Sequence, residues 1–369
     1  MTQLPQEIIS LIVWHLTSKS DLYNCTLVNY AFHHAANPLL WNKPALDSDD
    51  TTQRFIACLK ATQDPFTGRA SAQHVRDLAL SHRRWTDTDF IFVMQQTCHL
   101  ETLSILSRHI TDTSLRLLPR HSPRLHTLKL YGSSVSQFTI DALGQHCHQL
   151  THLTLSHCRN LGPDTFSALT RCPLTYLAIE HPGPGLTATF EKKVIHDLTC
   201  PAFGDGLRHL VLDVHSSSLG FIHRLLYLAT TSHRNVWHGL VSLTIAGYDH
   251  SNTNHDCLVV FLQSRRRSSL KHLHLLRAKH IDTLFNSSLT LDLTHVSLIH
   301  SSNVNERAIR RLVCQCCPML QSMDLLGCQL TPAMLPEASS SCHMQCETMT
   351  TVHRLDEDAI NKIRQAGMN

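Results

Sequence analysis

Hydrophobic residues recur along most of this chain in a six-position template, Leu-x-x-Leu-x-Leu. The apolar residues at its second and third leucine positions alternate with other residues, a pattern typical of a short strand that buries one face. Successive templates begin 23 to 33 residues apart, and chance does not produce ten such templates in one chain. The first positions are Val75, Leu100, Leu125, Leu150, Leu174, Leu207, Leu240, Leu270, Leu293 and Leu320.

A second set of apolar residues follows several of these strands at the spacing of a helix. After the second strand the set is Ile110, Leu115 and Leu118, so the repeating unit is strand, turn and helix. A single unit cannot bury its apolar face, whereas stacked units bury a continuous core. The pattern therefore predicts an α/β solenoid with parallel strands on a concave face and helices on a convex face. Helix N-caps are expected at Asp112, Asp164 and Asn303.

The first 41 residues carry helical spacing without the strand template. Apolar residues recur over residues 4–16 behind Pro5, which suits a first helical turn because its missing N–H would be unpaired there. Ser20 and Asp21 can cap a second helix, and a third apolar set runs over residues 32–41. Three helices in about 40 residues bury too little surface to be stable alone, so this module is expected to need a partner.

The same module resembles the F-box in the stretches LPQEIISLIVWHL, DLYNCTLVNYAF and NPLLW. The shared features are Leu-Pro-x-Glu-Ile, Asp-Leu, a Val followed four residues later by a large aromatic residue, and a closing Leu-Trp. Phe32 departs from the family pattern, where Trp is commoner. The resemblance implies that a Skp adaptor is the partner and that a cullin scaffold is reached through it. The matching positions, which would contact the adaptor or hold the helices that do, are Leu4, Pro5, Ile8, Ile12, Leu22, Val28 and Trp41.

The repeats resemble leucine-rich repeats of the cysteine-containing kind. Cys158 and Cys328 follow the last strand leucine by three residues, and Cys147, Cys172 and Cys316 stand at expected helix ends. The resemblance implies that the concave face meets a binding partner.

Four parts are expected along the chain. Residues 1–46 form the F-box, 47–70 a bridging helix, 71–335 a leucine-rich-repeat solenoid of about ten repeats, and 336–369 a tail with a capping helix. The bridge is expected to be packed, because it lacks Gly and Pro until Pro65.

The composition is that of a folded chain without a strong electrostatic field. It has 42% hydrophobic and 17% charged residues and a net charge of +3, which favours neither nucleic acid nor an anionic membrane. No secretory signal is recognisable at the start, and no run approaches about 18 consecutive apolar residues. We expect a cytoplasmic or nuclear protein, without membrane or nucleic-acid partners, whose 14 cysteines are reduced.

Catalytic and metal-binding patterns are missing from the sequence. It contains no GxSxG, Walker, GxGxxG or HExxH motif, so neither an enzyme activity nor a cofactor is expected. Cys342, His343 and Cys346 form one short group without a second pair, whereas a tetrahedral zinc site needs four ligands. No metal site is expected.

One column of residues on the predicted concave face is rich in histidine. This column, which precedes the second template leucine, holds four histidines among ten residues, against about 0.8 expected from 29 histidines in 369 residues. A row of imidazoles can respond to pH, bind an acidic peptide or hold a metal, and in a His-rich chain it can be an ordinary polar surface. The column reads Asp77, Thr102, Thr127, His152, Tyr176, His209, Ser242, His272, His295 and Ser322.

The concave face is also the predicted target-binding surface, because its strand side chains form one continuous surface. We find no arginine in its columns, and phosphate-binding sites usually cluster arginine, so a phosphorylated target segment is disfavoured. The residues predicted to bind the target are Lys129, Tyr131, His152, Tyr176, His209, Asp213, His272, His274, His295 and Asp324.

The combined pattern predicts a substrate-recognition subunit of a cullin-based ubiquitin ligase, in which the F-box docks the adaptor and the solenoid holds a protein target. Two alternatives stay open. One is a leucine-rich-repeat scaffold that never meets an adaptor, and the other is a repeat protein that regulates GTPases or is itself a hydrolase.

Overall fold

The computed structural model describes residues 4–61, 69–81, 85–132, 134–158, 160–181, 188–213, 219–231, 236–248, 257–264, 269–279, 281, 290–346 and 349–367. Contacts divide the chain into two compact units, Met1–Pro173 and Leu174–Asn369. Each unit is described by itself.

The first unit begins with three helices, α1 (Gln6–Trp14), α2 (Lys19–Thr26) and α3 (Tyr30–Asn42). Their shared core consists of Ile9, Val13, Leu22 and Ala36. The predicted cap of the second helix was wrong, because α2 begins earlier: the Ser18 hydroxyl accepts the Asp21 N–H at 3.4 Å.

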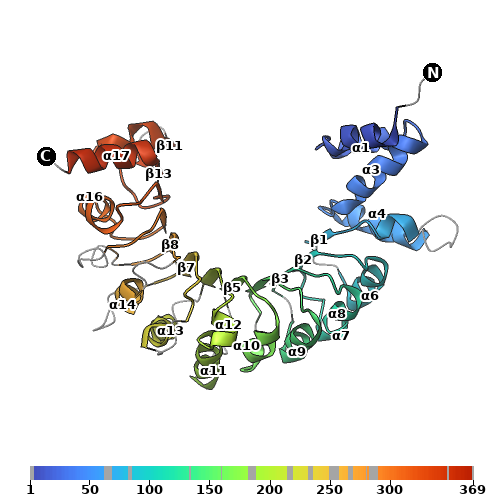
Figure 1. The fold of residues 1–369 in the computed structure, drawn as a ribbon, viewed down its shortest axis with the longest axis horizontal. Helices are drawn as coiled ribbons and strands as arrows, with labels where there is room; N and C mark the ends of the chain where they lie inside the picture. Colours follow the sequence, from blue (N-terminus) through green and yellow to red (C-terminus); the bar gives the residue numbers. More distant parts are fainter. Residues whose placement is uncertain are drawn as a thin grey trace. The chain divides into compact units, whose positions relative to one another are not determined.

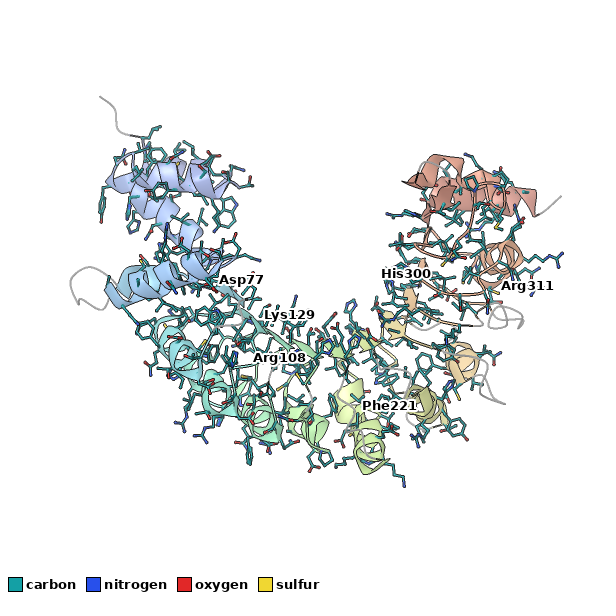
Figure 2. The ribbon with its side chains drawn as sticks, turned by 180° about the vertical axis from the view of Figure 1, so that it is seen from behind. Asp77, Arg108, Lys129, Phe221, His300 and Arg311 are labelled. Carbon is teal, nitrogen blue, oxygen red and sulfur yellow. The ribbon has the colours of Figure 1, made fainter. Side chains whose placement is uncertain are left out.

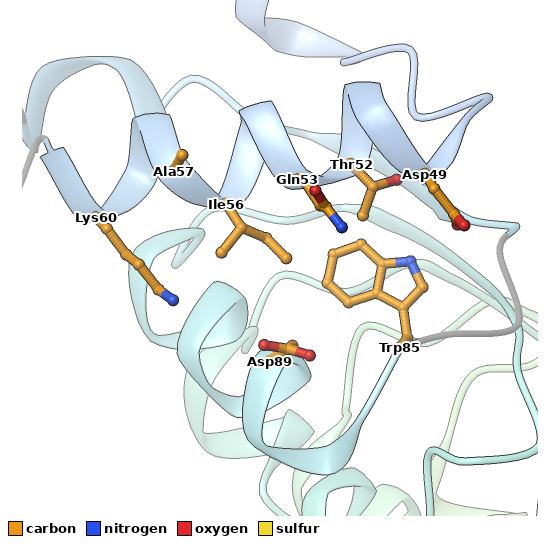
Figure 3. A pocket seen from close by; sticks show the side chains of 8 residues that line it. All are labelled: Asp49, Thr52, Gln53, Ile56, Ala57, Lys60, Trp85 and Asp89. Carbon is orange, nitrogen blue, oxygen red and sulfur yellow. The ribbon is translucent and has the colours of Figure 1, made fainter.

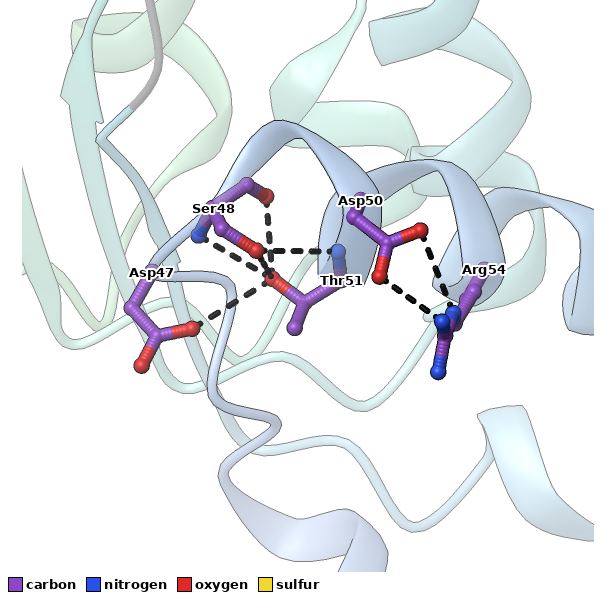
Figure 4. Close-up of polar contacts among 5 residues, drawn as sticks. All are labelled: Asp47, Ser48, Asp50, Thr51 and Arg54. Atoms are coloured by element: carbon purple, nitrogen blue, oxygen red, sulfur yellow. Dashed lines mark hydrogen bonds and ion pairs between the residues drawn. The ribbon is translucent and has the colours of Figure 1, made fainter.

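Helix α4 (Asp49–Ala61) follows, and its N-terminus is closed by a reciprocal cap (Figure 4). The Ser48 hydroxyl accepts the Thr51 N–H, and the Thr51 hydroxyl accepts the Ser48 N–H, both at 3.1 Å. Asp50 and Arg54 form an exposed ion pair one turn apart at 2.9 Å. The opposite face of α4 buries Phe55, and the short helix α5 (Arg69–Ala72) leads into the first strand.

Strands β1 (Asp77–Leu80), β2 (Thr102–Leu106), β3 (Thr127–Tyr131) and β4 (His152–Ser156) are parallel and paired in chain order. Equivalent template positions face one another, as Leu103 does Leu128 and Leu128 does Leu153. The helices of these repeats lie on one side of the strands (Figure 1). They are α6 (Asp87–Gln96), α7 (Asp112–Leu115), α8 (Leu118–His121), α9 (Gln137–His146), α10 (Thr165–Ala168) and the 3-10 turn η1 (Leu169–Arg171).

The three-helix module is tied to the first repeat by short-range polar contacts. The Arg76 N–H donates to the Asn42 carbonyl at 2.9 Å, and the Lys43 ammonium lies 2.7 Å from the Asp77 carboxylate. The Ser81 hydroxyl donates to the Leu46 carbonyl at 3.2 Å. The end of α3 is therefore held against β1.

The second unit continues the same repeat. Its strands β5 (Tyr176–Glu180), β6 (His209–Asp213), β7 (Ser242–Ala246), β8 (His272–Leu276), β9 (His295–Ile299) and β10 (Ser322–Asp324) are parallel and in chain order. The helices α11 (Ala188–Leu198), α12 (Pro201–Gly204), α13 (Leu219–Thr231), α14 (Cys257–Ser264) and α16 (Glu306–Arg311) lie on one side of them (Figure 1). A π-helical turn, η4 (Leu312–Cys316), extends α16.

The C-terminal segment closes the last repeat. After η5 (Pro336–Ser341), β11 (Cys342–Cys346) and β12 (Met349–Val352) form an antiparallel pair, and β13 (Arg354–Leu355) pairs antiparallel with β10. Helix α17 (Glu357–Ala366) buries Ile360 and Ile363. The side chains of the predicted Cys342, His343 and Cys346 group lie outside the described residues. The predicted fold class, helices followed by parallel strands with helices on one side, is confirmed in these units.

The predicted helix caps at Asp112 and Asn303 were wrong. Thr111 caps α7, because its hydroxyl accepts the Thr113 N–H at 3.2 Å. Asn305 caps α16, because its amide oxygen accepts the Ala308 N–H at 2.9 Å. Asp112 instead bonds to the cap of the next repeat, where its Oδ1 accepts the Ser136 N–H at 3.0 Å. Asp164 does stand at the N-cap of α10, without a side-chain cap bond.

Candidate functional site

Helix α1 and Leu4, which lies just before it, expose a row of apolar side chains beside the buried residues of the helix. Leu4 is 54% exposed, Ile8 42%, Leu11 58% and Ile12 44%, whereas Ile9 is 4% exposed. A single exposed leucine needs no explanation, but a row of four large apolar side chains marks an interaction surface.

Helices α2 and α3 add further exposed apolar groups to this module. Leu22 points into the core of the three helices, but its neighbours in sequence point outward. The exposed residues of this second group are Tyr23, Leu27, Val28 and Tyr30.

The predicted adaptor residues therefore divide by position. Leu4, Pro5, Ile8, Ile12 and Val28 are exposed and available to a partner. Two others hold the module together. They are Leu22, which lies in the core, and Trp41, whose half-buried ring packs at 6.0 Å from that of Phe55.

The strand face that turns away from the helices is the second candidate surface. In the first unit it carries Lys129 and Tyr131 on β3 and the exposed His152 on β4. Lys129 lies directly beside Ser104 on β2 and Thr154 on β4 in the register of the sheet. Figure 2 shows Lys129 on the strand side of this unit.

In the second unit the same face carries a row of rings. The register aligns Tyr176, His209, Ser242, His272 and His295 across five successive strands. The Tyr176 and His209 ring centroids are 6.1 Å apart, and those of His272 and His295 are 4.6 Å apart and stacked. Ser242 separates the two ring pairs. The predicted histidine column is therefore brought together here.

A second row runs beside the first, two residues further along each strand. His274 stands in it on β8, beside Ser297 on β9, which in turn lies beside Asp324 on β10. The His274 ring is parallel to that of His272 at 6.4 Å. The predicted target residues His272, His274, His295 and Asp324 therefore lie on adjoining strands.

Burial and neighbouring imidazoles lower the pKa of two of these histidines. Burial lowers the pKa of His272, and the nearby His295, His274 and His209 lower it further. The pKa of His274 is also lowered, chiefly by burial, although the Asp324 carboxylate opposes the shift. Both rings are therefore mainly neutral at neutral pH.

Threonine hydroxyls orient two histidines of the face in the same way. The Thr294 hydroxyl donates to the Lys271 carbonyl at 3.3 Å and lies 2.8 Å from His295 Nδ1. The contact at Nδ1 fixes the orientation of the His295 ring. Thr151 holds His152 by the same pair of contacts, at 3.2 and 2.9 Å.

Residues that follow the strands adopt the left-handed backbone conformation, which the sequence did not reveal. The residue after the strand has positive φ in several repeats, and its N–H bonds to the next strand, as Arg277 N does to the Ile299 carbonyl at 2.8 Å. Non-glycine residues rarely adopt this conformation, and such positions often occur at binding sites. The row comprises Gly132, His157, His181, Gly247, Arg277, His300 and Gly327.

Arg277 corrects the prediction that no arginine belongs to this face. Its guanidinium binds both carboxylate oxygens of Asp213, at 2.8 and 2.9 Å, across the intervening strand β7. That strand ends in Ala246 and is followed by Gly247, and these small residues leave room for the long side chain. His181 lies 3.7 Å from the same carboxylate. The columns of the template missed Arg277 because it stands one residue beyond them.

A cavity of about 340 Å³ lies in the first unit between α4 and α6 (Figure 3). Its lining includes Ile56, Ala57 and Lys60 of α4 together with Trp85 and Asp89, and the Ile56 side chain points toward the Trp85 ring. The Trp85 ring is 2% exposed, and it fills the space between the bridge helix and the first repeat. The cavity is a packing space between these two elements.

Metal and membrane sites were also sought. Within the described ranges, no three His, Cys, Asp or Glu side chains are arranged to hold a metal ion. Among the helices that the structure describes, none has the length and apolar content to cross a bilayer.

Comparisons with known proteins identify the N-terminal module. The family model of the COS11 F-box domain matches residues 1–84, so the chain carries an F-box domain at its N-terminus. No curated protein sequence matches this chain.

Solved structures with a similar chain path were also found. One is the Rad7 and Elc1 complex of yeast, with 15% identity, a TM-score of 0.44, and coverage of 91% of this chain and 90% of that one. Another is an internalin of Listeria monocytogenes, with 14% identity, a TM-score of 0.35, and coverage of 69% and 68%.

Proposed function

We propose that this chain, which carries an F-box domain in residues 1–84, is the substrate-recognition subunit of a cullin-based ubiquitin ligase. In this proposal the F-box docks a Skp adaptor, which in turn binds the cullin. The strand face of the repeats holds the protein target. The chain is a receptor and not an enzyme, and it works in the cytoplasm or the nucleus.

The observation that supports adaptor docking best is the exposed apolar row of α1. Ile8 and Ile12 lie one turn apart on the side of the helix that faces away from the module's own core. Nothing in the fold of the three helices requires large apolar residues there. A partner that covers this row would remove it from water and stabilise a module with a small core.

The proposed mechanism is positioning. A receptor that binds the cullin complex at one end and a target at the other raises the effective concentration of target lysines near the ubiquitin-carrying enzyme. The polar contacts between α3 and β1, such as the Lys43–Asp77 ion pair, would keep the distance between docking helices and first repeat constant.

Adaptor docking is tested by co-purification of the full chain with a Skp adaptor. The double variant Ile8→Glu/Ile12→Glu places two carboxylates in the proposed apolar contact, so we expect its affinity for the adaptor to fall at least about 100-fold. Ser10→Glu is the matched control, since Ser10 is exposed on the same helix but off the apolar row. It should bind as the wild type does.

Two results would end this proposal. One is a wild-type chain that does not bind the adaptor, and the other is a double variant that binds it undiminished. Circular dichroism of each variant checks that the helices are retained, which is expected because both isoleucines are exposed.

The alternatives are separated by a second measurement. A receptor should promote ubiquitination of a bound target only in the presence of adaptor and cullin. Turnover of a nucleotide or ester by the purified chain alone would favour the enzyme or GTPase-regulator alternative.

A further inference from the structure

Four histidines of the second unit form a cluster that the adaptor-docking proposal leaves without a role. We call His209, His272, His274 and His295 the histidine patch. His209 comes from β6, the next two from β8 and the last from β9. All four side chains are half-buried on the face away from the helices.

The patch is held together by the sheet register. His272 lies directly opposite His295, and their rings stack at 4.6 Å. His274 follows two residues after His272 on the same strand, with its ring parallel at 6.4 Å. Because neighbouring strands set these spacings, the rings stay together in any side-chain rotamer that keeps them on this face.

A threonine hydroxyl fixes the position of the His295 ring. The Thr294 hydroxyl lies 2.8 Å from His295 Nδ1 and also donates to the Lys271 carbonyl at 3.3 Å. With Nδ1 occupied by this contact, Nε2 is the ring nitrogen that can contact a ligand.

Permanent charges around the patch largely compensate one another. Asp213 at the end of β6 is paired with Arg277 and lies near His181. Asp324 on β10 lies 3.8 Å from Arg354 of β13.

Further charged and neutral groups complete the surroundings of the patch. Lys271 precedes β8 and donates to the carbonyl of the exposed Asp292 at 3.3 Å. Glu180 stands at the end of β5, and β7 contributes the neutral Ser242 and Thr244. Among these side chains, imidazole is the type whose charge ordinarily changes near neutral pH.

We propose that the histidine patch binds a carboxylate-rich, acidic segment of the target and takes up protons as it does so. The inference rests on the proposed function, because it assigns a chemical class to the target of that receptor. An extended acidic segment lying across the strands would place carboxylates against several rings at once, and each protonated ring would donate a charge-assisted hydrogen bond.

The sign of the pH dependence follows from linkage. Mutual repulsion and burial keep His272 and His274 mainly neutral when the patch is empty. Bound carboxylates favour the protonated rings, so affinity rises as pH falls, by at most about ten-fold per pH unit for each proton gained.

The test uses the full chain and a fluorescent polyglutamate peptide of about ten residues, with polyglutamine of equal length as the uncharged control. Affinity is measured by fluorescence anisotropy at about pH 7.5 and about pH 6.0. We expect polyglutamate to bind at least about ten-fold more tightly at the lower pH, and polyglutamine to bind weakly at both.

Substitutions assign the effect to the patch. The double variant His272→Gln/His295→Gln should bind polyglutamate about ten-fold more weakly at pH 6.0 and lose most of the pH dependence. The control is His238→Gln, an exposed histidine outside the strands, which should leave both unchanged. Equal binding of polyglutamine, or a pH dependence that survives the double substitution, overturns the proposal.

Two further readouts keep the result unambiguous. Binding that disappears when EDTA is added would show a metal-mediated contact and would also overturn the proposal. Adaptor co-purification is measured on the same variants. If the double variant still captures the adaptor while polyglutamate binding behaves contrary to expectation, the histidine inference fails and the proposed function stands.

Discussion

At the residue scale, Gly144 shows how closely two repeats approach. A Cβ atom at this position of α9 would lie 2.0 Å from the Ala168 carbonyl oxygen of α10. Real Cβ atoms do not come so near a backbone oxygen. The absence of a side chain is therefore what allows these two helices to pack backbone to backbone.

Gly144→Ala should destabilise the chain by about 1–3 kcal/mol, because the backbone of α10 must move away, and the gain in helix propensity is smaller. The midpoint of urea unfolding measures the change. Gly220→Ala on α13 is the control, since its Cβ would meet nothing nearer than the Arg224 side chain at 3.7 Å. It should be neutral or slightly stabilising, and an equal loss in both variants would contradict the packing argument.

The cysteines show a second residue-scale property, which is suppressed reactivity. Burial raises the pKa of Cys147 to about 12, with a contribution from Cys172, and burial raises that of Cys172 to about 11. Since the thiolate is the nucleophile, both side chains are inert in the folded chain. They act as small apolar residues between helices.

Alkylation of the native chain with iodoacetamide at about pH 8 should therefore modify the exposed Cys98 well before Cys147 or Cys172. Mass spectrometry of tryptic peptides follows each site. In urea all three should react at similar rates. Rapid native labelling of Cys147 would mean that the packing between these repeats opens readily.

At the element scale, aspartates at the first helical position link two of the early repeats to the repeats that follow them. Asp87 Oδ1 accepts the Thr111 N–H at 2.8 Å, and Oδ2 accepts the Thr111 hydroxyl at 2.6 Å. Thr111 in turn caps α7, and Asp112 holds the next cap residue, Ser136, in the same way. The helix starts are therefore connected by hydrogen bonds that run across repeats.

Asp87→Asn should cost about 1 kcal/mol at neutral pH, because one charge-assisted acceptor is replaced and the site is partly screened by solvent. Burial alone would raise the pKa of Asp87, but bonds from Ser114 and Thr111 lower it below the usual 3.8. The stabilisation is therefore present above that value and is lost as pH falls through the lower, folded pKa.

Urea unfolding at about pH 7, 4 and 3 tests this expectation. The difference between wild type and Asp87→Asn should shrink below about pH 4. Asp50→Asn, which removes only an exposed ion pair with Arg54, is the control and should change little at any pH. A difference between wild type and Asp87→Asn that grows on acidification would contradict the assigned sign.

At the scale of the whole molecule, the proposed function depends on how docking and target binding are connected. Within the first unit, the end of α3 contacts the start of β1 through the Asn42–Arg76 hydrogen bond and the Lys43–Asp77 ion pair. Such a connection would matter to a receptor, because ubiquitin transfer depends on the separation of target and enzyme.

Insertion of a flexible Gly-Ser segment of about nine residues between Asn42 and Lys43 should leave adaptor binding and target binding unchanged. The rate of ubiquitin transfer to a bound target should fall about three-fold or more, because the effective concentration drops. The same segment added at the C-terminus is the control. Transfer at the wild-type rate by the inserted chain would mean that this connection has no part in positioning.

The sequence alone indicated the strands and helices of the repeats and the direction of most of their leucines, but not the antiparallel pair β11 and β12 in the C-terminal segment. Strand alternation and helical spacing are short-range properties, so Leu103, Leu128 and Leu153 could be assigned to the buried face without coordinates. The resemblance of the first 41 residues to the F-box was likewise visible without coordinates, because it rests on residue types at short spacings.

Only the tertiary structure decided which polar groups meet. Arg277 reaches Asp213 across 64 residues of sequence, and it does so because β7 ends in small residues between them. Asp112 joins the cap of the next repeat instead of capping its own helix. The histidine column became a patch through the register of β6 to β9. Such contacts depend on strand register and on the residues of intervening repeats, which no local periodicity encodes.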